Sequence, residues 1–414
     1  MFGGKLNPSL LDLKHLNYFD LSFNNFFASP IPSFLGSVKN LTSLNLSNAR
    51  FVGLIPHQLG NLSNLHYLNL EGYYLHVNNL EWLSGLPLLQ HLDKSSVNLS
   101  KASDWLQLTY TLPSLLELRL SYNCQLPLIP PTPTVNFSSL LVDVHNMTSL
   151  RHLDLFGNNF NSSIPNWLYS FSRLEFLNLG YNNLQGTISS AIGNLTSAIS
   201  IDLSSNELGG KLSRSLGNLY NLREISLSYN KWSQEIFEIL ESLSGCLSDG
   251  LEILDLSHSQ LHGHLTDELG VFKNLVELFT GSNSISGPIP VSLGILSSLT
   301  YLDLLYNQFN ETLPQNFGQL SKLETLLIES NMLEGVVSEV HFSNLTSLIN
   351  LYASRNKLTL EVSYNWNPPF QLVSLSFQSW NLGPNFPAWL CSQRHLQRLD
   401  ISNARIFGVV PPPF

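Results

Sequence analysis

One motif recurs along this chain of 414 residues and constrains its fold more than any other feature. The motif is LxxLxLxxN, seen clearly in LRHLDLFGN (150–158), LEFLNLGYN (174–182) and LTYLDLLYN (299–307). Counting weaker copies gives sixteen repeats, and ten of the fifteen steps between them are 24 residues long. One such unit cannot bury its own apolar residues, so each repeat needs neighbours stacked on both sides. The pattern therefore predicts a solenoid.

The last position of the motif is usually Asn, whose side chain we expect inside the turn, bonded to buried backbone groups. The sixteen equivalent positions are 24, 49, 73, 97, 123, 158, 182, 206, 230, 259, 283, 307, 331, 356, 380 and 404. Ala49 and Ala404 leave gaps, and one missing bond of this kind costs about 1 kcal/mol. Tyr73 and Trp380 are too large for an Asn-sized niche, so we expect the backbone to take a different path there.

The second half of each repeat follows LxGxIP, as in ISGPIP (285–290). Gly287 is expected to ease a tight turn, and segments such as 291–299 are expected to return along the outer face as short helical turns. These features predict an α/β-type solenoid of about sixteen 24-residue repeats. It would be a leucine-rich-repeat horseshoe or superhelix, with a concave parallel sheet and short helical or extended segments on the convex side.

Two insertions break the period. The first, 124–149, is rich in proline and is expected to be an extended excursion. In the second, 231–250, Ile236, Ile239, Leu240 and Leu243 fit one face of a helix. The repeats resume after each, so we predict a single solenoid over 1–414. Neither end carries a visible polar cap or signal peptide, and no run of 18 apolar residues is present, which is the expectation for a piece of a longer protein.

The composition favours a glycosylated extracellular surface. Only 12% of the residues are charged, against about 25% in typical soluble domains. The net charge of −10 argues against nucleic acid or an anionic membrane as a partner. Glycans would keep such a surface in solution, and ten N-x-S/T sequons are present. They start at Asn40, Asn45, Asn61, Asn98, Asn136, Asn146, Asn161, Asn194, Asn310 and Asn344.

The x positions of LxxLxLxx are expected on the concave face. They are rich in aromatic residues, and we predict ligand contacts at Tyr122, Phe156, Tyr181, Tyr229, His258, Phe279, Tyr301, Tyr306, Tyr352 and Arg355. The alternative is that such tyrosines only cover their neighbours. A glycan on Asn45 would block the first strands and favour a ligand site in repeats five to fourteen.

Seven Asp residues occupy the position between the last two apolar strand residues, and no two fall in consecutive repeats: Asp20, Asp93, Asp154, Asp202, Asp255, Asp303 and Asp400. Neighbouring parallel strands lie about 4.8 Å apart, so this spacing limits repulsion between carboxylates. Two interpretations remain open. The row is either an electrostatically tolerable consensus or an acidic stripe that receives basic groups of a ligand.

Catalytic and metal chemistry find little support. His258, His262 and His264 lie close in sequence, but the turn between them is expected to disperse their side chains. No GxSxG, P-loop or HExxH motif is present. The three cysteines, Cys124, Cys246 and Cys391, are several repeats apart, too far for a disulfide. We therefore predict a binding protein without cofactor, metal site or enzymatic activity.

Four stretches resemble plant leucine-rich-repeat receptor-like proteins, particularly the ethylene-inducing-xylanase receptor type: 4–22, 57–70, 82–107 and 365–390. The resemblance implies the ectodomain of a cell-surface immune receptor at the plasma membrane. Such a receptor binds a microbial protein or peptide and signals through co-receptor and adaptor kinases. Two alternatives remain: a soluble inhibitor of microbial wall-degrading enzymes, similar to the polygalacturonase inhibitors, or a truncated receptor product without independent function.

Overall fold

The computed structural model describes residues 4–27, 29–103, 105–107, 111–122, 124–126, 149–245 and 247–410. Asn123, Asn136, Asn146, Cys246 and most of the insertion 124–149 lie outside them. The contacts group the chain into two compact units, 1–207 and 208–414, which we describe separately. The prediction of one solenoid over the whole chain stays a prediction.

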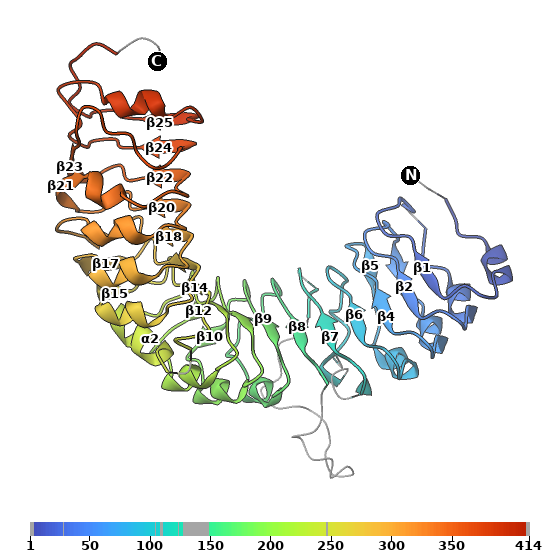
Figure 1. Ribbon diagram of the computed structural model, residues 1–414. Helices are drawn as coiled ribbons and strands as arrows, with labels where there is room; N and C mark the ends of the chain where they lie inside the picture. Colours follow the sequence, from blue (N-terminus) through green and yellow to red (C-terminus); the bar gives the residue numbers. More distant parts are fainter. Residues whose placement is uncertain are drawn as a thin grey trace. The chain divides into compact units, whose positions relative to one another are not determined.

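Unit 1 contains eight short parallel strands, each aligned with the next along the chain (Figure 1). They are β1 (Tyr18–Asp20), β2 (Ser43–Asn45), β4 (Tyr67–Asn69), β6 (His91–Asp93), β7 (Glu117–Arg119), β8 (His152–Asp154), β9 (Phe176–Asn178) and β11 (Ser200–Asp202). Equivalent repeat positions face each other, for example Leu153 and Leu177 on β8 and β9. This register keeps every inward leucine in the same row.

Unit 2 repeats this arrangement with eight further parallel strands. They are β13 (Glu224–Ser226), β14 (Ile253–Asp255), β16 (Glu277–Phe279), β18 (Tyr301–Asp303), β20 (Thr325–Leu327), β22 (Asn350–Tyr352), β24 (Ser374–Ser376) and β25 (Arg398–Asp400). The predicted helix of the second insertion is α2 (Ile236–Leu243). Its four predicted core residues, Ile236, Ile239, Leu240 and Leu243, are all buried, so this prediction is confirmed.

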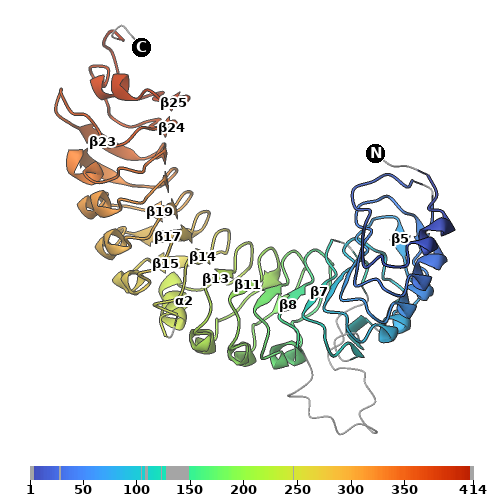
Figure 2. The same cartoon turned by 45° about the vertical axis from the view of Figure 1, so that its right-hand side comes forward.

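Single 3-10 turns lie on the side of each unit opposite the sheet (Figure 2). In unit 1 they are η1 (Pro8–Asp12), η2 (Ser33–Ser37), η3 (His57–Asn61), η4 (Glu81–Gly85), η5 (Trp105–Gln107), η8 (Asn166–Ser170) and η9 (Ser190–Asn194). In unit 2 they are η10 (Arg214–Asn218), η11 (Asp267–Val271), η12 (Val291–Ile295), η13 (Gln315–Gln319), η14 (Glu339–Phe342) and η15 (Ala388–Ser392). Successive turns pack closely, since a Cβ at Gly60 would lie 2.3 Å from the carbonyl oxygen of Trp82. The glycine of LGxL is therefore a packing requirement.

Short strands also form on the flank between sheet and turns. They are β3 (Gly53–Leu54), β5 (Leu75–His76), β10 (Gln185–Gly186), β12 (Glu207–Leu208), β15 (His262–His264), β17 (Ser284–Gly287), β19 (Gln308–Phe309), β21 (Glu334–Ser338) and β23 (Lys357–Glu361). Gly287 at the end of β17 has a φ of +80°, which confirms the turn predicted from LxGxIP.

The Asn side chains form the predicted ladder inside both units. Asn182 is fully buried, and its Nδ2 donates to the carbonyl oxygens of Leu155, Leu179 and Gly180 at 2.9–3.0 Å. Its Oδ1 accepts the backbone N–H of Asn158 at 2.7 Å. Each rung thus satisfies carbonyls of its own repeat and of the preceding one, groups that would otherwise be buried without partners.

Trp380 corrects one prediction. Its backbone follows the same path as the Asn positions, because Ser379 before it has a φ of 68°, like the residues that precede the other rungs. The indole Nε1 donates to the carbonyl oxygen of Ala353 at 2.7 Å, replacing the amide that an Asn would supply. The ring is buried and stacks on Phe377 with centroids 4.1 Å apart. A tryptophan therefore acts as a rung, with its bulk filling the core.

Tyr73 does follow a different path. At fifteen of the sixteen rung positions the preceding residue has a positive φ, and the exception in the described chain is Gly72, before Tyr73. The Tyr73 side chain is 71% exposed and leaves the interior altogether. The described cysteines are free: Cys124 is buried and Cys391 is exposed.

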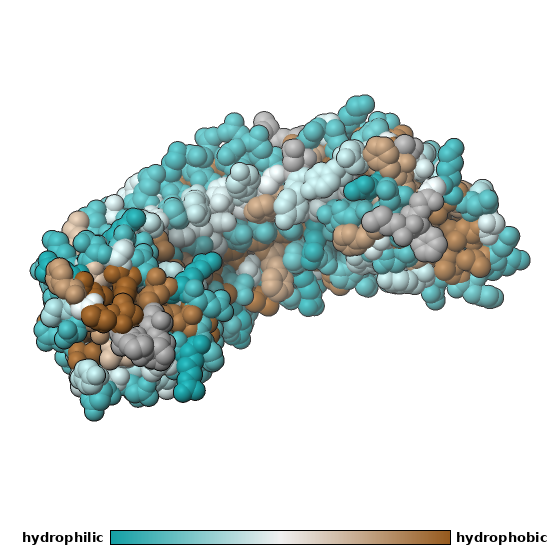
Figure 3. All heavy atoms as spheres, turned by 90° about the horizontal axis from the view of Figure 1, so that it is seen from above, coloured by the Kyte–Doolittle hydropathy of each residue, from teal (hydrophilic) through white to brown (hydrophobic). Residues whose placement is uncertain are grey.

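The last repeat of unit 2 exposes apolar side chains. Phe407 and Val409 are 86% and 87% exposed. In the view from above, hydrophobic residues gather at this end of the unit (Figure 3). In the interior of the unit, by contrast, the middle strand residues such as Leu302 and Leu326 are buried between neighbouring repeats.

Candidate ligand-binding surface

The first and third residues of every strand point away from the core, and we call the surface they form the sheet face of each unit. The middle residue is half-buried in β1 and β25 and buried in the other strands of the sheet, as in the pattern exposed, buried, half-buried along β9. This alternation follows from the two-residue period of a strand. The outward positions are therefore free to vary without damage to the core.

The sheet face is acidic in both units. In each unit five outward strand positions carry a carboxylate and one carries an arginine. The carboxylates belong to Asp20, Asp93, Glu117, Asp154 and Asp202 in unit 1, and to Glu224, Asp255, Glu277, Asp303 and Asp400 in unit 2. The arginines are Arg119 and Arg398. Such a surface favours ligands with basic groups.

Three of the predicted aromatic residues lie in one row on unit 1. The rings of Tyr122 and Phe156 meet edge to face with centroids 5.4 Å apart, and Phe156 stacks on Tyr181 at 6.0 Å. Both tyrosines expose more than half of their side chains. The row offers a continuous flat apolar surface with phenol groups at its rim, which suits a protein or peptide partner.

Unit 2 carries the other seven predicted residues. Tyr229 and His258 stack with ring centroids 4.2 Å apart, and Phe279 and Tyr301 lie 4.9 Å apart on adjacent strands. Tyr352 is half-buried on β22. Tyr306 and Arg355 are exposed.

Strand alternation does not orient all of these residues. Six of the ten lie directly after the strand, in the turn before the rung, where φ is between 49° and 63°. They are Tyr122, Tyr181, Tyr229, His258, Tyr306 and Arg355. The left-handed turn, not the strand, aims these side chains, at one edge of the sheet face. Their role in binding stays a prediction.

The Asp row has a structural function that the spacing did not reveal. The Oδ1 atom of Asp303 accepts the backbone N–H of Leu305 at 2.9 Å, and the same i to i+2 bond occurs at the other six Asp residues. The amides of Asn45, Asn69 and Asn178 accept equivalent bonds in other repeats. The side chain closes the strand end by an Asx-type turn, which explains the recurrence of Asp and Asn.

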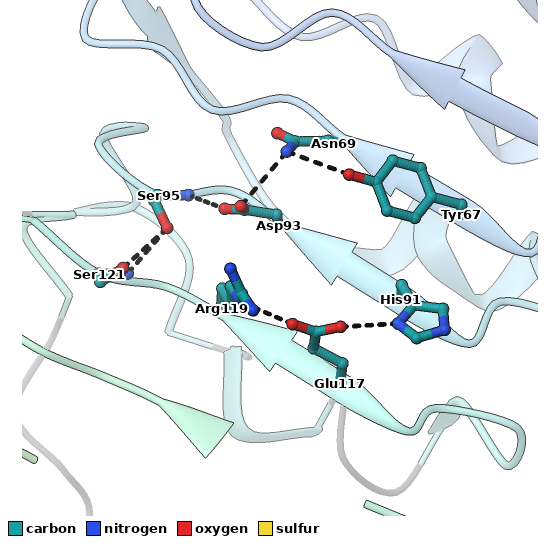
Figure 4. A network of polar contacts seen from close by, with 8 residues as sticks. All are labelled: Tyr67, Asn69, His91, Asp93, Ser95, Glu117, Arg119 and Ser121. Carbon is teal, nitrogen blue, oxygen red and sulfur yellow. Dashed lines mark hydrogen bonds and ion pairs between the residues drawn. The ribbon is translucent and has the colours of Figure 1, made fainter. Parts of the chain in front are cut away.

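A polar cluster across β4, β6 and β7 is the feature that sequence reasoning missed (Figure 4). Glu117 lies between His91 and Arg119, with its carboxylate oxygens 2.7 Å from Nδ1 of His91 and 2.5 Å from Nε of Arg119. On the neighbouring strand, Asn69 donates to Asp93 at 3.3 Å. A hollow of about 190 Å³ opens between these side chains.

The pKa values of the two carboxyl groups in this cluster are shifted in opposite directions. Burial alone would raise the pKa of Glu117, but the hydrogen bond from His91 and the charge of Arg119 hold that pKa below its ordinary value. Burial raises the pKa of Asp93, in spite of the bonds from Ser95. Glu117 is therefore a compensated anion, already paired within the sheet face.

Asp303 in unit 2 is a contrasting case. Burial, reinforced by the negative charge of Asp255, raises the pKa of Asp303 to about 6 from an ordinary value of 3.8. Its partners in register are Phe279 on β16 and Leu327 on β20, so neither neighbouring strand offers a polar side chain at this position. An apolar setting of this kind disfavours the charged form of a carboxyl group.

The two larger hollows lie off the sheet face. One of about 610 Å³ lies between the end of β23 and the loop 382–388, and it is lined in part by Tyr364 and Trp389. The other, of about 430 Å³, lies beside η4 and includes His57 and Trp82. His262 and His264 are on flank strand β15, whereas His258 is in the turn after β14, so the three imidazoles do not share one strand.

Comparison with known proteins agrees with this architecture. The sequence pattern of the Leucine Rich Repeat family matches residues 40–62, 149–171, 173–195 and 298–320. The ectodomain of the Arabidopsis receptor kinase HAESA, solved with the peptide hormone IDA and the co-receptor SERK1, is similar in fold. Its TM-score is 0.64 at 24% identity, over 96% of this chain and 72% of that one. The molecule is a leucine-rich-repeat solenoid protein.

Two curated relatives narrow the class. The chain is 39% identical to Receptor-like protein EIX1 and 37% identical to Receptor-like protein EIX2, both from Solanum lycopersicum. Each match covers 99% of this chain and 44% of the relative, so the chain spans less than half the length of either. Over nearly its whole length, the chain resembles plant leucine-rich-repeat receptor-like proteins of the EIX type. Leucine-rich-repeat ectodomains of this kind bind other molecules and are not themselves enzymes.

Proposed function

We propose that this chain is the ligand-binding part of a plant cell-surface immune receptor that recognises a microbial protein or peptide. The observation that carries the proposal is the sheet face, where aromatic rings and carboxylates follow one another over successive strands. The ring pair Phe279 and Tyr301 and the row around Phe156 supply the kind of rigid contact area that dominates protein interfaces. The carboxylates supply specificity for a basic partner.

Signalling in this proposal requires other proteins. The likeness to EIX1 and EIX2 supports a receptor as the parent protein, and the proposal assigns signalling to co-receptor and adaptor kinases. None of the helices in the described residues is both long and apolar enough to cross a bilayer. Within the receptor, the role that we propose for this chain is recognition of the ligand.

Glycosylation is part of the proposal. Of the ten sequon residues, the six that are exposed in the described chain are Asn40, Asn61, Asn161, Asn194, Asn310 and Asn344. Asn45 and Asn98 are half-buried, and the Nδ2 of Asn45 donates to Asp20 at 3.0 Å on the sheet face. No sequon occurs between Asn194 and Asn310, so β13 to β18 of unit 2 offer a sheet face without predicted glycans.

The test begins with secretion of the 414-residue chain from plant cells behind a heterologous signal peptide. Its mass before and after removal of N-glycans reports the occupied sequons. The purified chain is then measured by biolayer interferometry against a panel of microbial wall-degrading enzymes, with a fungal endoxylanase first. Saturable binding to one enzyme supports the proposal, and absence of binding across the panel contradicts this ligand class.

A pair of variants separates the sheet face from the rest of the surface. Tyr301→Ala removes one half of a ring pair on the sheet face, and Val291→Ala removes an exposed apolar side chain from η12. Loss of a central interface aromatic commonly weakens binding by about tenfold or more. We expect that loss for Tyr301→Ala and no change for Val291→Ala.

A further inference from the structure

On the sheet face of unit 2, Asp303 lies among apolar side chains. Its nearest outward neighbours along the chain are Tyr301 and Leu305, and its partners in register are Phe279 and Leu327. All five side chains are half-buried, and we call them together the Asp303 site. A carboxylate is thus set at the centre of four hydrophobic neighbours.

The charge of Asp303 has little compensation from the protein. Its one hydrogen bond within the described chain is the Asx-type bond from the backbone N–H of Leu305 to Oδ1. Within the part of the chain that the structure describes, no donor reaches Oδ2 and no ion pair includes Asp303. The effect of Asp255 is repulsive.

Among the described residues Asp154 and Asp202 likewise accept only the backbone i to i+2 bond, whereas other carboxylates in the same structural position also receive side-chain donors. Asp255 accepts bonds from the hydroxyls of Ser226 and Ser257 at 3.1 and 2.7 Å. Asp400 accepts the Ser402 hydroxyl at 2.7 Å. The Asp303 site differs because both neighbouring strands present hydrophobic groups where Ser226 presents a hydroxyl. A carboxylate that is half-buried among hydrophobic groups and keeps one oxygen without a donor points to a function in addition to the Asx-type turn.

We propose that the Asp303 site binds a cationic side chain of the ligand, with the guanidinium of an arginine as the preferred occupant. This inference rests on the proposed function, because it names the group of the ligand that the sheet face recognises. The free Oδ2 can accept an N–H from the cation. The Phe279 and Tyr301 rings, 4.9 Å apart, offer π faces beside the carboxylate.

Arginine suits this combination better than lysine. Its guanidinium is planar, stacks on aromatic rings and is more weakly hydrated than an ammonium. It therefore loses less hydration free energy when it enters apolar surroundings. A hydrogen bond between two charged groups is also shorter and stronger than a neutral one. Glu277 on β16 pairs in register with Tyr301 on β18 and adds a second negative charge beside the Asp303 site.

Space at the site comes from Gly281. A Cβ at this position would lie 2.7 Å from Oδ1 of Asp303, so the carboxylate lies directly over the glycine backbone. No larger residue could occupy position 281 with the carboxylate in this place. The lack of a side chain at position 281 therefore leaves room for the carboxylate.

The experiment measures the pKa of Asp303 in the full chain with a small probe. The protein is labelled with carboxyl-¹³C aspartate, and the Asp303 resonance is assigned by its absence in Asp303→Asn. The resonance is followed against pH alone, with about 50 mM N-acetyl-arginine amide, and with the same concentration of N-acetyl-citrulline amide at matched ionic strength. A cation that binds the ionised form lowers the apparent pKa by linkage.

We expect the arginine probe to lower the apparent pKa of Asp303 by about half a unit or more, and the neutral citrulline probe to leave it unchanged. Asp400, which already has its hydroxyl donor, is the matched control and should not respond. Tyr301→Leu keeps an apolar side chain without a π face and should reduce the shift. Equal responses at Asp303 and Asp400, equal responses to both probes, or an unchanged shift in Tyr301→Leu would each overturn the inference.

This titration uses no microbial enzyme, so its failure and the failure of the proposed function are distinguishable. An arginine response without binding across the enzyme panel would contradict the proposed function alone. Enzyme binding without an arginine response would contradict the inference about Asp303 alone.

Discussion

The substitution Asp303→Asn tests the electrostatics of the sheet face most sharply. Burial raises the pKa of Asp303 to about 6, against 3.8 for an ordinary aspartate. One pKa unit corresponds to about 1.4 kcal/mol, so the ionised carboxylate costs the folded state up to about 3 kcal/mol above pH 6. Asparagine keeps the shape and the acceptor for the Leu305 amide, but it carries no charge.

The sign follows from proton linkage. Between pH 3.8 and 6 the folded state holds a proton that the unfolded state has lost, so wild-type stability falls as pH rises through this range. Asp303→Asn should therefore unfold at a temperature several degrees above wild type at pH 7.5, with the difference shrinking towards pH 4. Thermal unfolding by circular dichroism at a series of pH values measures this difference.

Asp400→Asn is the matched control, because the bonds from Ser402 lower the pKa of Asp400 and its charge is stabilised in the folded state. That variant should gain no stability at pH 7.5. If the Asp303→Asn variant is no more stable than wild type at pH 7.5, or if its gain in stability does not depend on pH, the ionised Asp303 carboxylate does not destabilise the folded state.

Three further predictions concern the interior. Asn182→Ala leaves the carbonyls of Leu155, Leu179 and Gly180 without their amide partner. It should lower the free energy of unfolding in urea by about 3 kcal/mol or more. A loss below about 1 kcal/mol would contradict the stabilising role of the Asn ladder. Trp380→Phe keeps the stack on Phe377 but removes the hydrogen bond to the Ala353 carbonyl. The same assay should show a loss of about 1–2 kcal/mol in the free energy of unfolding. Unchanged stability would show that the indole N–H is dispensable. Burial raises the pKa of the Cys124 thiol to about 12, so in peptide mapping after iodoacetamide treatment of the native protein the exposed Cys391 should be alkylated and Cys124 should not.

The repeat itself could be predicted from the sequence because its physics is local. The spacing of leucines determines which side chains are buried, and the Asn at the end of each motif has the same carbonyls to satisfy in every repeat. Asn182 and the helix around Ile239 therefore lie as expected. Trp380 was misjudged from size alone, because an indole N–H can donate to the same carbonyl as an amide while its ring fills core volume.

The polar cluster and the Asp303 site depend on the register between strands, which is harder to predict from the sequence than the repeat itself. His91 and Glu117 are 26 residues apart, and their contact requires that an irregular repeat keep its strands aligned. The environment of Asp303 was accessible in principle, since its register partners Phe279 and Leu327 occupy the same repeat position in adjacent copies. A single residue's burial could not be derived from its own repeat.

Two single substitutions that create new sequons test the central claim, that the sheet face binds the ligand. Tyr352→Thr completes a sequon at Asn350 on β22, within the sheet face. Gln319→Asn creates one at the exposed end of η13, in the same GNLS context as the native sequon at Asn61. Both chains are secreted from plant cells, checked for the added glycan by mass, and measured against the enzyme that the wild-type chain binds. We expect the glycan on β22 to weaken binding by about tenfold or more and the glycan on η13 to have no effect. Equal binding by both glycosylated chains would show that the ligand does not contact the sheet face.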